Sequence, residues 1–165
     1  MTEKNVFQSE KFEPITELEF KDAKLKAKGT FFFDIEAEKY AKEDKDGNVG
    51  SGYHEILQGI LNRKTKSIVE FWDCALAYSK QRPTKEEIQE VIQDVIEKEG
   101  TTLGLLQGAI QVLGESGFFK EEFKMFWFQM SQGPKMVKQE EKEGMKAGAE
   151  FMKETYKTLT GKAPY

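Results

Sequence analysis

The sequence predicts a mainly α-helical protein, built as a compact multi-helix domain with a short N-terminal β-hairpin and a charged C-terminal helix. Over most of the chain after residue 30, apolar residues recur at the three- and four-residue spacing of amphipathic helices. Alternation of apolar and polar residues is confined to residues 15–28. A chain of 165 residues is long enough for one domain that buries roughly 70% of its unfolded surface.

The N-terminal part divides into an arm and a hairpin. Residues 1–14 are polar and end at Pro14, so we expect a flexible arm. In residues 15–28, apolar residues such as Leu18 and Phe20 alternate with charged ones. This alternation predicts a β-hairpin with one face packed on the domain.

The first helix is expected over residues 31–43, after a turn at Gly29. Thr30 is a suitable N-cap, because its hydroxyl can accept a hydrogen bond from an amide of the first turn. Its predicted buried face consists of Phe33, Ala37, Tyr40 and Ala41.

Residues 44–52 are the most loop-like part of the chain, and they match no functional loop. An EF-hand calcium loop needs glycine at its sixth position, but Gly47 comes two positions too early after Asp44. A phosphate-binding loop needs a lysine after its glycines, and none follows. A nucleophile elbow around Ser51 needs glycine where Val49 stands. We predict a loop between helices that is either disordered or an exposed contact loop.

Further helices are predicted in succession beyond this loop. The clearest begins at Thr84, because Thr84 and Glu87 have the spacing of a capping box, and it ends at Gly100. The predicted buried stripes are Tyr53, Ile56, Leu57, Ile60 and Leu61; Ile68, Phe71, Trp72, Ala75 and Leu76; Ile88, Val91, Ile92, Val95 and Ile96; and Leu106, Ala109, Ile110 and Leu113.

The segment Gly114–Met130 is the densest aromatic part of the chain. If Gly117 ends one helix and the next begins at Phe118, one face of that helix is apolar and is expected in the core. The expected core face consists of Phe119, Phe123, Phe126, Trp127 and Met130. Large apolar residues outside this face are expected to contact a partner protein, and they are Phe118, Met125 and Phe128.

The C-terminal part begins at the stop signal Gly133–Pro134, which ends the expected domain of residues 15–132. Residues 133–165 are predicted to form a charged helical extension with a thin apolar stripe. This extension either docks on its own domain, frays, or serves as a partner-binding arm. The stripe consists of Met145, Ala149, Met152, Tyr156 and Leu159, of which Met145, Met152 and Tyr156 are expected partner contacts.

The composition argues against several classes of protein. The net charge of −4 gives no electrostatic reason to bind nucleic acid, since lysines are interleaved with glutamates. No apolar run is long enough for a signal peptide or a membrane span, so we expect a cytoplasmic protein.

Catalytic and metal-binding residues are not evident. His54, the single histidine, has no partner suggested by the sequence, and we expect it at the surface. Cys74, the single cysteine, lies in an apolar pattern and is expected to be buried and inert. One histidine and one cysteine do not make a zinc site. We therefore expect no catalytic residue, no metal and no cofactor.

The order of elements resembles that of a known family. The hairpin, the Asp-Gly-Asn loop, the Thr-Lys-Glu-Glu-Ile helix cap and above all the motif Glu115–Lys120 resemble the tail assembly chaperones of long-tailed phages and prophages of Gram-positive bacteria. The resemblance covers about residues 15–130.

This resemblance implies a non-enzymatic helical protein that binds the phage tape measure protein and helps recruit tail tube subunits. It also implies action in the cytoplasm of the infected or lysogenic bacterial host and absence from the mature virion. A homo-oligomer is compatible with it. The competing hypotheses are a helical DNA-binding or packaging accessory protein and a small enzyme acting through His54.

Overall fold

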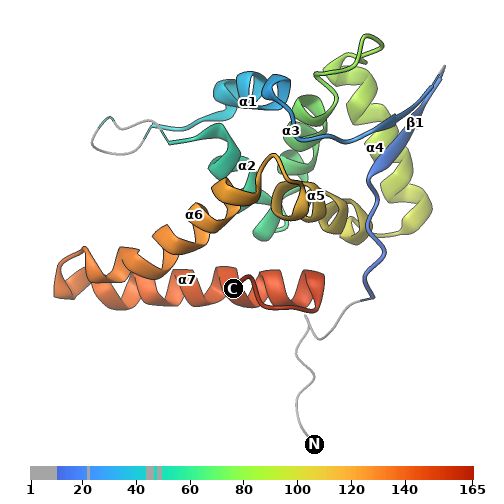
Figure 1. Ribbon diagram of the computed structural model, residues 1–165. Coiled ribbons are helices and arrows are strands. Elements are labelled where there is room, and N and C mark those ends of the chain that lie inside the picture. Colours follow the sequence, from blue (N-terminus) through green and yellow to red (C-terminus); the bar gives the residue numbers. More distant parts are fainter. Residues whose placement is uncertain (1–10, 22, 44–46, 48–49) are drawn as a thin grey trace, which may run out of the picture. The chain divides into compact units, whose positions relative to one another are not determined.

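The computed structural model describes residues 11–21, 23–43, 47 and 50–165 (Figure 1). The chain forms two compact units, a first of residues 13–120 and a second that contains residues 121–165. Most of the expected arm, residues 1–10, lies outside the described residues. The expected division into an arm, a domain ending at residue 132 and an extension stays a prediction.

The predicted hairpin is present in the first unit. Strands β1 (Glu17–Phe20) and β2 (Ala23–Lys26) pair antiparallel, with Leu18 opposite Leu25. Both leucines are buried, whereas the flanking cross-strand pairs unite a glutamate with a lysine on the exposed face. Opposite charges directly across a strand pair stabilise the register, so the period-two pattern fixes both the pairing and the buried face.

The first helix is shorter than expected. Helix α1 (Phe31–Ala37) is capped by the Thr30 hydroxyl, which accepts a hydrogen bond from the Phe33 amide, and it tightens into the 3-10 turn η1 (Glu38–Tyr40). The prediction of one helix to residue 43 is therefore wrong. Two adjacent side chains of η1, those of Lys39 and Tyr40, both bind Asp73, and such tertiary contacts override a local preference for helix.

Four helices build the rest of the first unit: α2 (Gly52–Leu61), α3 (Thr65–Ala75), α4 (Lys85–Glu99) and α5 (Leu103–Glu115). The stripes predicted for α2, α3 and α5 are confirmed, since every residue in them is buried. In α4 the capping box and the Gly100 end are confirmed, but only Ile88 and Ile92 are fully buried. Most of the expected loop, residues 44–46 and 48–49, lies outside the described residues.

Close backbone approach explains one glycine of α5. The amide of Ile15 donates to the Gly104 carbonyl at 2.9 Å, which holds the segment before β1 against the helix. A side chain at Gly108 would collide with the backbone carbonyl of Ile15. Glycine is therefore required where these two backbones meet.

The aromatic segment is divided differently from the prediction. Helix α6 (Lys120–Gln132) begins at Lys120 rather than Phe118, because the chain first turns at residues 116–119, where the Phe119 amide donates to Ser116. Phe119 therefore precedes α6 and lies in the core of the first unit, with its ring 4.9 Å from that of Phe33 and 4.7 Å from that of Tyr53. The expected single stripe is thus split between the two units.

The second unit is a helical hairpin, which we call the α6–α7 hairpin (residues 121–165). Helix α6 leads through the 3-10 turn η2 (Gly133–Lys135) into α7 (Gln139–Thr160), which runs back alongside it (Figure 1). Aromatic rings join the helices: Tyr156 of α7 lies 5.6 Å from Phe123 and 5.7 Å from Trp127. Met130 is only half-buried, in contrast to the prediction. No helix in the described part of the chain is long and apolar enough to cross a membrane.

Candidate protein-docking site

The most polar buried cluster surrounds Asp73 on α3. Its carboxylate accepts hydrogen bonds from Lys39 at 2.7 Å, from the Tyr40 hydroxyl at 2.7 Å and from Arg82 at 3.0 Å. Burial alone would raise the pKa of Asp73, but the hydrogen bonds from Lys39 and Tyr40 outweigh it and hold the pKa below its ordinary value. Arg82 also binds Glu36 of α1 at 3.1 Å. The cluster therefore joins α1 and η1 to α3.

The two residues singled out for chemistry lie in different surroundings. Cys74 is buried as predicted, and burial raises the pKa of its thiol, which keeps it protonated and unreactive. His54 is half-buried rather than exposed, next to the ring of Tyr53 at 5.7 Å, so the prediction of a surface position is wrong. Burial lowers its pKa. Its helix begins at Gly52, packed on the Ala37 carbonyl, and this close packing draws the first turn inward.

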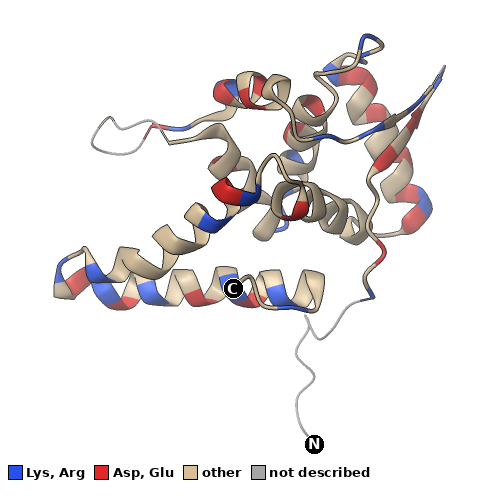
Figure 2. Cartoon of the chain, viewed as in Figure 1, with Lys and Arg blue, Asp and Glu red and all other residues tan. Residues whose placement is uncertain are grey.

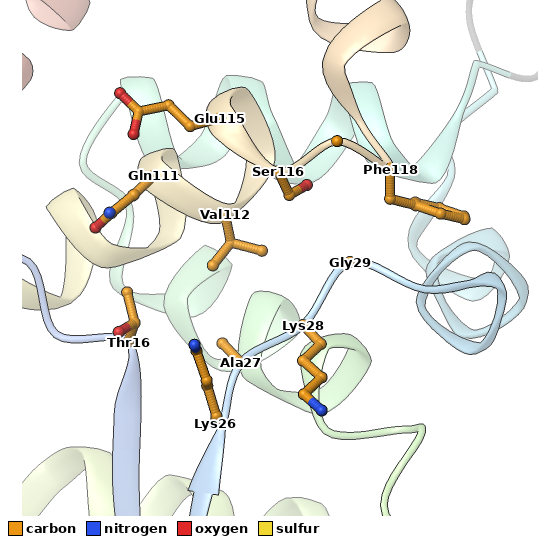
Figure 3. Close-up of a pocket in the computed structure, with 11 residues that line it drawn as sticks. Thr16, Lys26, Ala27, Lys28, Gly29, Gln111, Val112, Glu115, Ser116 and Phe118 are labelled. Atoms are coloured by element: carbon orange, nitrogen blue, oxygen red, sulfur yellow. The ribbon is translucent and has the colours of Figure 1, made fainter.

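The motif Glu115–Lys120 borders a hollow of about 500 Å³ in the first unit (Figure 3). One wall is the chain leaving β2, with Lys26 and Ala27, and the other is the end of α5. Val112 points into the space from α5, whereas Phe118 points away from it (Figure 3). The buried hydroxyl of Ser116 has no hydrogen-bond partner among the described residues.

Phe118 lies beside a row of exposed apolar side chains on α1. Its ring makes an edge-to-face contact with that of Phe31 at 5.1 Å between centroids. Phe31, Phe32 and Ile35 expose 76%, 57% and 64% of their surface. We call these four residues the Phe118 surface. An exposed hydrophobic group of this kind is typical of a protein-docking surface.

The sequence prediction found Phe118 but missed its three neighbours on α1. A signal was present in the run Phe31-Phe32-Phe33. Successive helical residues diverge by about 100°, so three adjacent phenylalanines do not all face one core. Phe33 is fully buried, and the other two are left outside.

The remaining predicted contact residues lie on the α6–α7 hairpin, and they fall into two groups. Met125 and Phe128 on α6 and Met145 on α7 are exposed, by 50%, 59% and 41%. Met152 and Tyr156 are buried, and Tyr156 packs between the helices. These two can contact a partner only if the hairpin opens, and their role stays a prediction. The six residues therefore belong to two units, with Phe118 in the first and the other five on the α6–α7 hairpin.

Charges of both signs are interspersed along the helices, as Figure 2 shows for α4 and α7. No group of histidine, cysteine, aspartate and glutamate suited to hold a metal ion occurs within the described ranges. Exposed apolar groups occur on both units, and groups of this kind are typical of protein-docking surfaces.

Comparison with known families agrees with this interpretation. The model of the family described as phage tail assembly chaperone protein, TAC, matches residues 17–127, which is well over half of the chain. Neither a curated protein nor a solved structure matches the chain significantly. The match includes β1, the Phe118 surface and the motif Glu115–Lys120, and it ends within α6 at Trp127. The chain belongs to the phage tail assembly chaperone family.

Proposed function

From this membership we propose that the protein is a non-enzymatic chaperone that binds the tape measure protein and helps recruit tail tube subunits during tail assembly. The observation that carries the proposal is the Phe118 surface. Its exposed side chains lie within the part of the chain that the family model matches. The proposal places the protein in the cytoplasm of the bacterial host and outside the mature virion.

The chemistry of the Phe118 surface suits a reversible chaperone. Phe31, Phe32 and Ile35 offer an apolar face that can cover an apolar stripe on a helical partner. Asp34 and Glu36 lie on the same helix and flank that face with negative charge. An apolar centre with charged surroundings favours binding while keeping the complex soluble.

Binding also explains how such a protein acts without catalysis. A protein that binds the assembly-competent form of a partner shifts its equilibrium by mass action, and it leaves when a tighter partner replaces it. Tail tube subunits would replace the chaperone as they polymerise around the tape measure protein.

Co-expression tests the proposal directly. The tape measure protein of the same phage is expressed alone and together with this chain, and its soluble fraction and co-purification are measured. We expect it to be insoluble alone and to co-purify with the chain when the two are made together. An insoluble tape measure protein and no complex would contradict the proposal. Addition of the tail tube protein should then release the chain from the complex.

A further inference from the structure

Two hollows lie along the α6–α7 hairpin, one of about 490 Å³ and one of about 240 Å³. Both are bordered by Trp127, Ser131 and Tyr165. The side chains of Trp127 and Tyr165 therefore stand between them. We call the two hollows together the Trp127 groove.

Tyr165 is weakly held in this position. Its ring lies 6.2 Å from that of Trp127 and beneath the ammonium group of Lys153, 4.6 Å from the ring centre. The side chain nevertheless remains 68% exposed. Gly161 ends α7 in the left-handed conformation, with φ of 77°, and this allows the last residues to turn back toward α6. Withdrawal of Tyr165 would remove one of the side chains that separate the two hollows.

Trp127 supplies an apolar floor with an unused donor. It is 3% exposed, and its indole nitrogen has no hydrogen-bond partner among the described residues. Buried indole N–H groups normally find an acceptor, but that of Trp72 in the first unit also has none among the described residues. Met130 and Pro134 extend the apolar lining on the side of the larger hollow. Most of the Trp127 ring, including its indole nitrogen, is thus enclosed, and a ligand can contact it only after a neighbouring side chain such as that of Tyr165 has moved.

The rim of the groove is basic, although the chain carries a net charge of −4. Lys135, Lys142 and Lys146 border the larger hollow and form no ion pair within the described part of the chain. Glu143 and Glu150 are the acidic residues on the same rim. Lysines that no carboxylate of the described residues neutralises attract an acidic partner.

We propose that the Trp127 groove binds an amphipathic helical segment with an apolar stripe and acidic flanks, and that Tyr165 withdraws when the segment enters. This inference rests on the proposed function, because it takes the segment to belong to the tape measure protein. The apolar stripe would cover Trp127 and Met130, and the acidic flank would face Lys142 and Lys146. A partner carbonyl or carboxylate would accept from the indole nitrogen of Trp127.

A pair of designed helical peptides tests the groove without the natural partner. One has a leucine stripe flanked by glutamates, and in the other lysines replace the glutamates. Binding of each labelled peptide to the full chain is measured by fluorescence anisotropy at low and high salt. We expect the acidic peptide to bind at least about tenfold more tightly than the basic one, with a difference that shrinks as salt screens the charges.

Charge reversal at the rim gives the matched variants. Lys142→Glu with Lys146→Glu should weaken binding of the acidic peptide about tenfold. The control reverses two exposed lysines of the other unit, Lys64→Glu with Lys80→Glu, and should leave binding unchanged. Tyr165→Ala should strengthen binding about threefold, since a side chain that covers part of the groove is gone. Circular dichroism verifies that each variant is folded.

Four outcomes would overturn the inference. The first is equal affinity for the acidic and the basic peptide, and the second is unchanged affinity after the rim reversal. The third is an equal loss of affinity in the control variant. The fourth is a rim reversal that changes only the self-association of the chain, measured by analytical ultracentrifugation. Co-expression separates this inference from the proposed function. If the unmodified chain does not solubilise the tape measure protein, the proposed function is wrong. If the unmodified chain and the rim variant solubilise it equally well, only the groove inference is wrong.

Discussion

The two units differ in the depth of their apolar cores. In residues 13–120, the stripes of α2 and α3 are fully buried, and the buried charge of Asp73 is bound by three donors. In the α6–α7 hairpin, a thin aromatic core joins two helices, and Met125 and Phe128 are exposed. A fully enclosed core specifies a stable fold. Both units also keep large apolar side chains at the surface, Phe31 and Ile35 in the first and Met125 and Phe128 in the second, where a partner can bind.

Phe119→Ala should have the largest effect on the first unit. The ring is fully buried between Phe33 and Tyr53. Its removal leaves a cavity and should lower the free energy of unfolding by about 3–5 kcal/mol. Urea denaturation measures the change. Phe128→Ala, at an exposed position on α6, is the matched control and should stay within about 0.5 kcal/mol. Equal losses in the two variants would remove the distinction between the units.

Asp73→Asn should have the next largest effect. The asparagine cannot satisfy Lys39 and Arg82 as a carboxylate does, and the expected loss is about 3 kcal/mol. A carboxyl whose pKa is lower in the folded chain stabilises the fold above its unfolded pKa, and this stabilisation is lost as the pH falls through the folded pKa. The stability difference between parent and variant should therefore shrink below about pH 3.9. Urea denaturation at several pH values measures it, and a constant difference would contradict the account.

Trp127→Ala should act on the hairpin and spare the first unit. Its ring packs on Phe123 and Tyr156, and its loss should cost about 2 kcal/mol, because a small hairpin relaxes around the cavity. Hydrogen exchange should accelerate in α7 and stay unchanged in α2 and α3. Acceleration across the whole chain would show that the two units unfold together.

The same comparison explains what the sequence could predict. Stripes in α2, α3 and α5 were predictable because helical period and burial coincide where a helix is enclosed by its own unit. The division at Lys120 was not predictable, since Phe119 is held by rings that are distant in sequence. Helical periodicity placed Phe119 on the same face as Phe123, but it does not indicate which of the two units each side chain packs in.

The candidate site was partly predictable for a related reason. An apolar excess on α6 indicated Met125 and Phe128, and both are exposed. The α1 face escaped prediction because only the buried side of this helix was read from the sequence, although Phe31 and Phe32 cannot face the same core as Phe33. Burial of Met152 depends on which face of α6 meets α7, and the local pattern does not specify this.

The central claim is that the Phe118 surface binds the tape measure protein and contributes little to the fold. Phe31→Ser with Ile35→Ser replaces two of its most exposed residues. Co-purification with co-expressed tape measure protein, together with urea denaturation of the variant alone, tests the claim most directly. We predict that the complex is lost while the unfolding free energy changes by less than about 0.5 kcal/mol. Full recovery of the complex by the folded variant would contradict the claim.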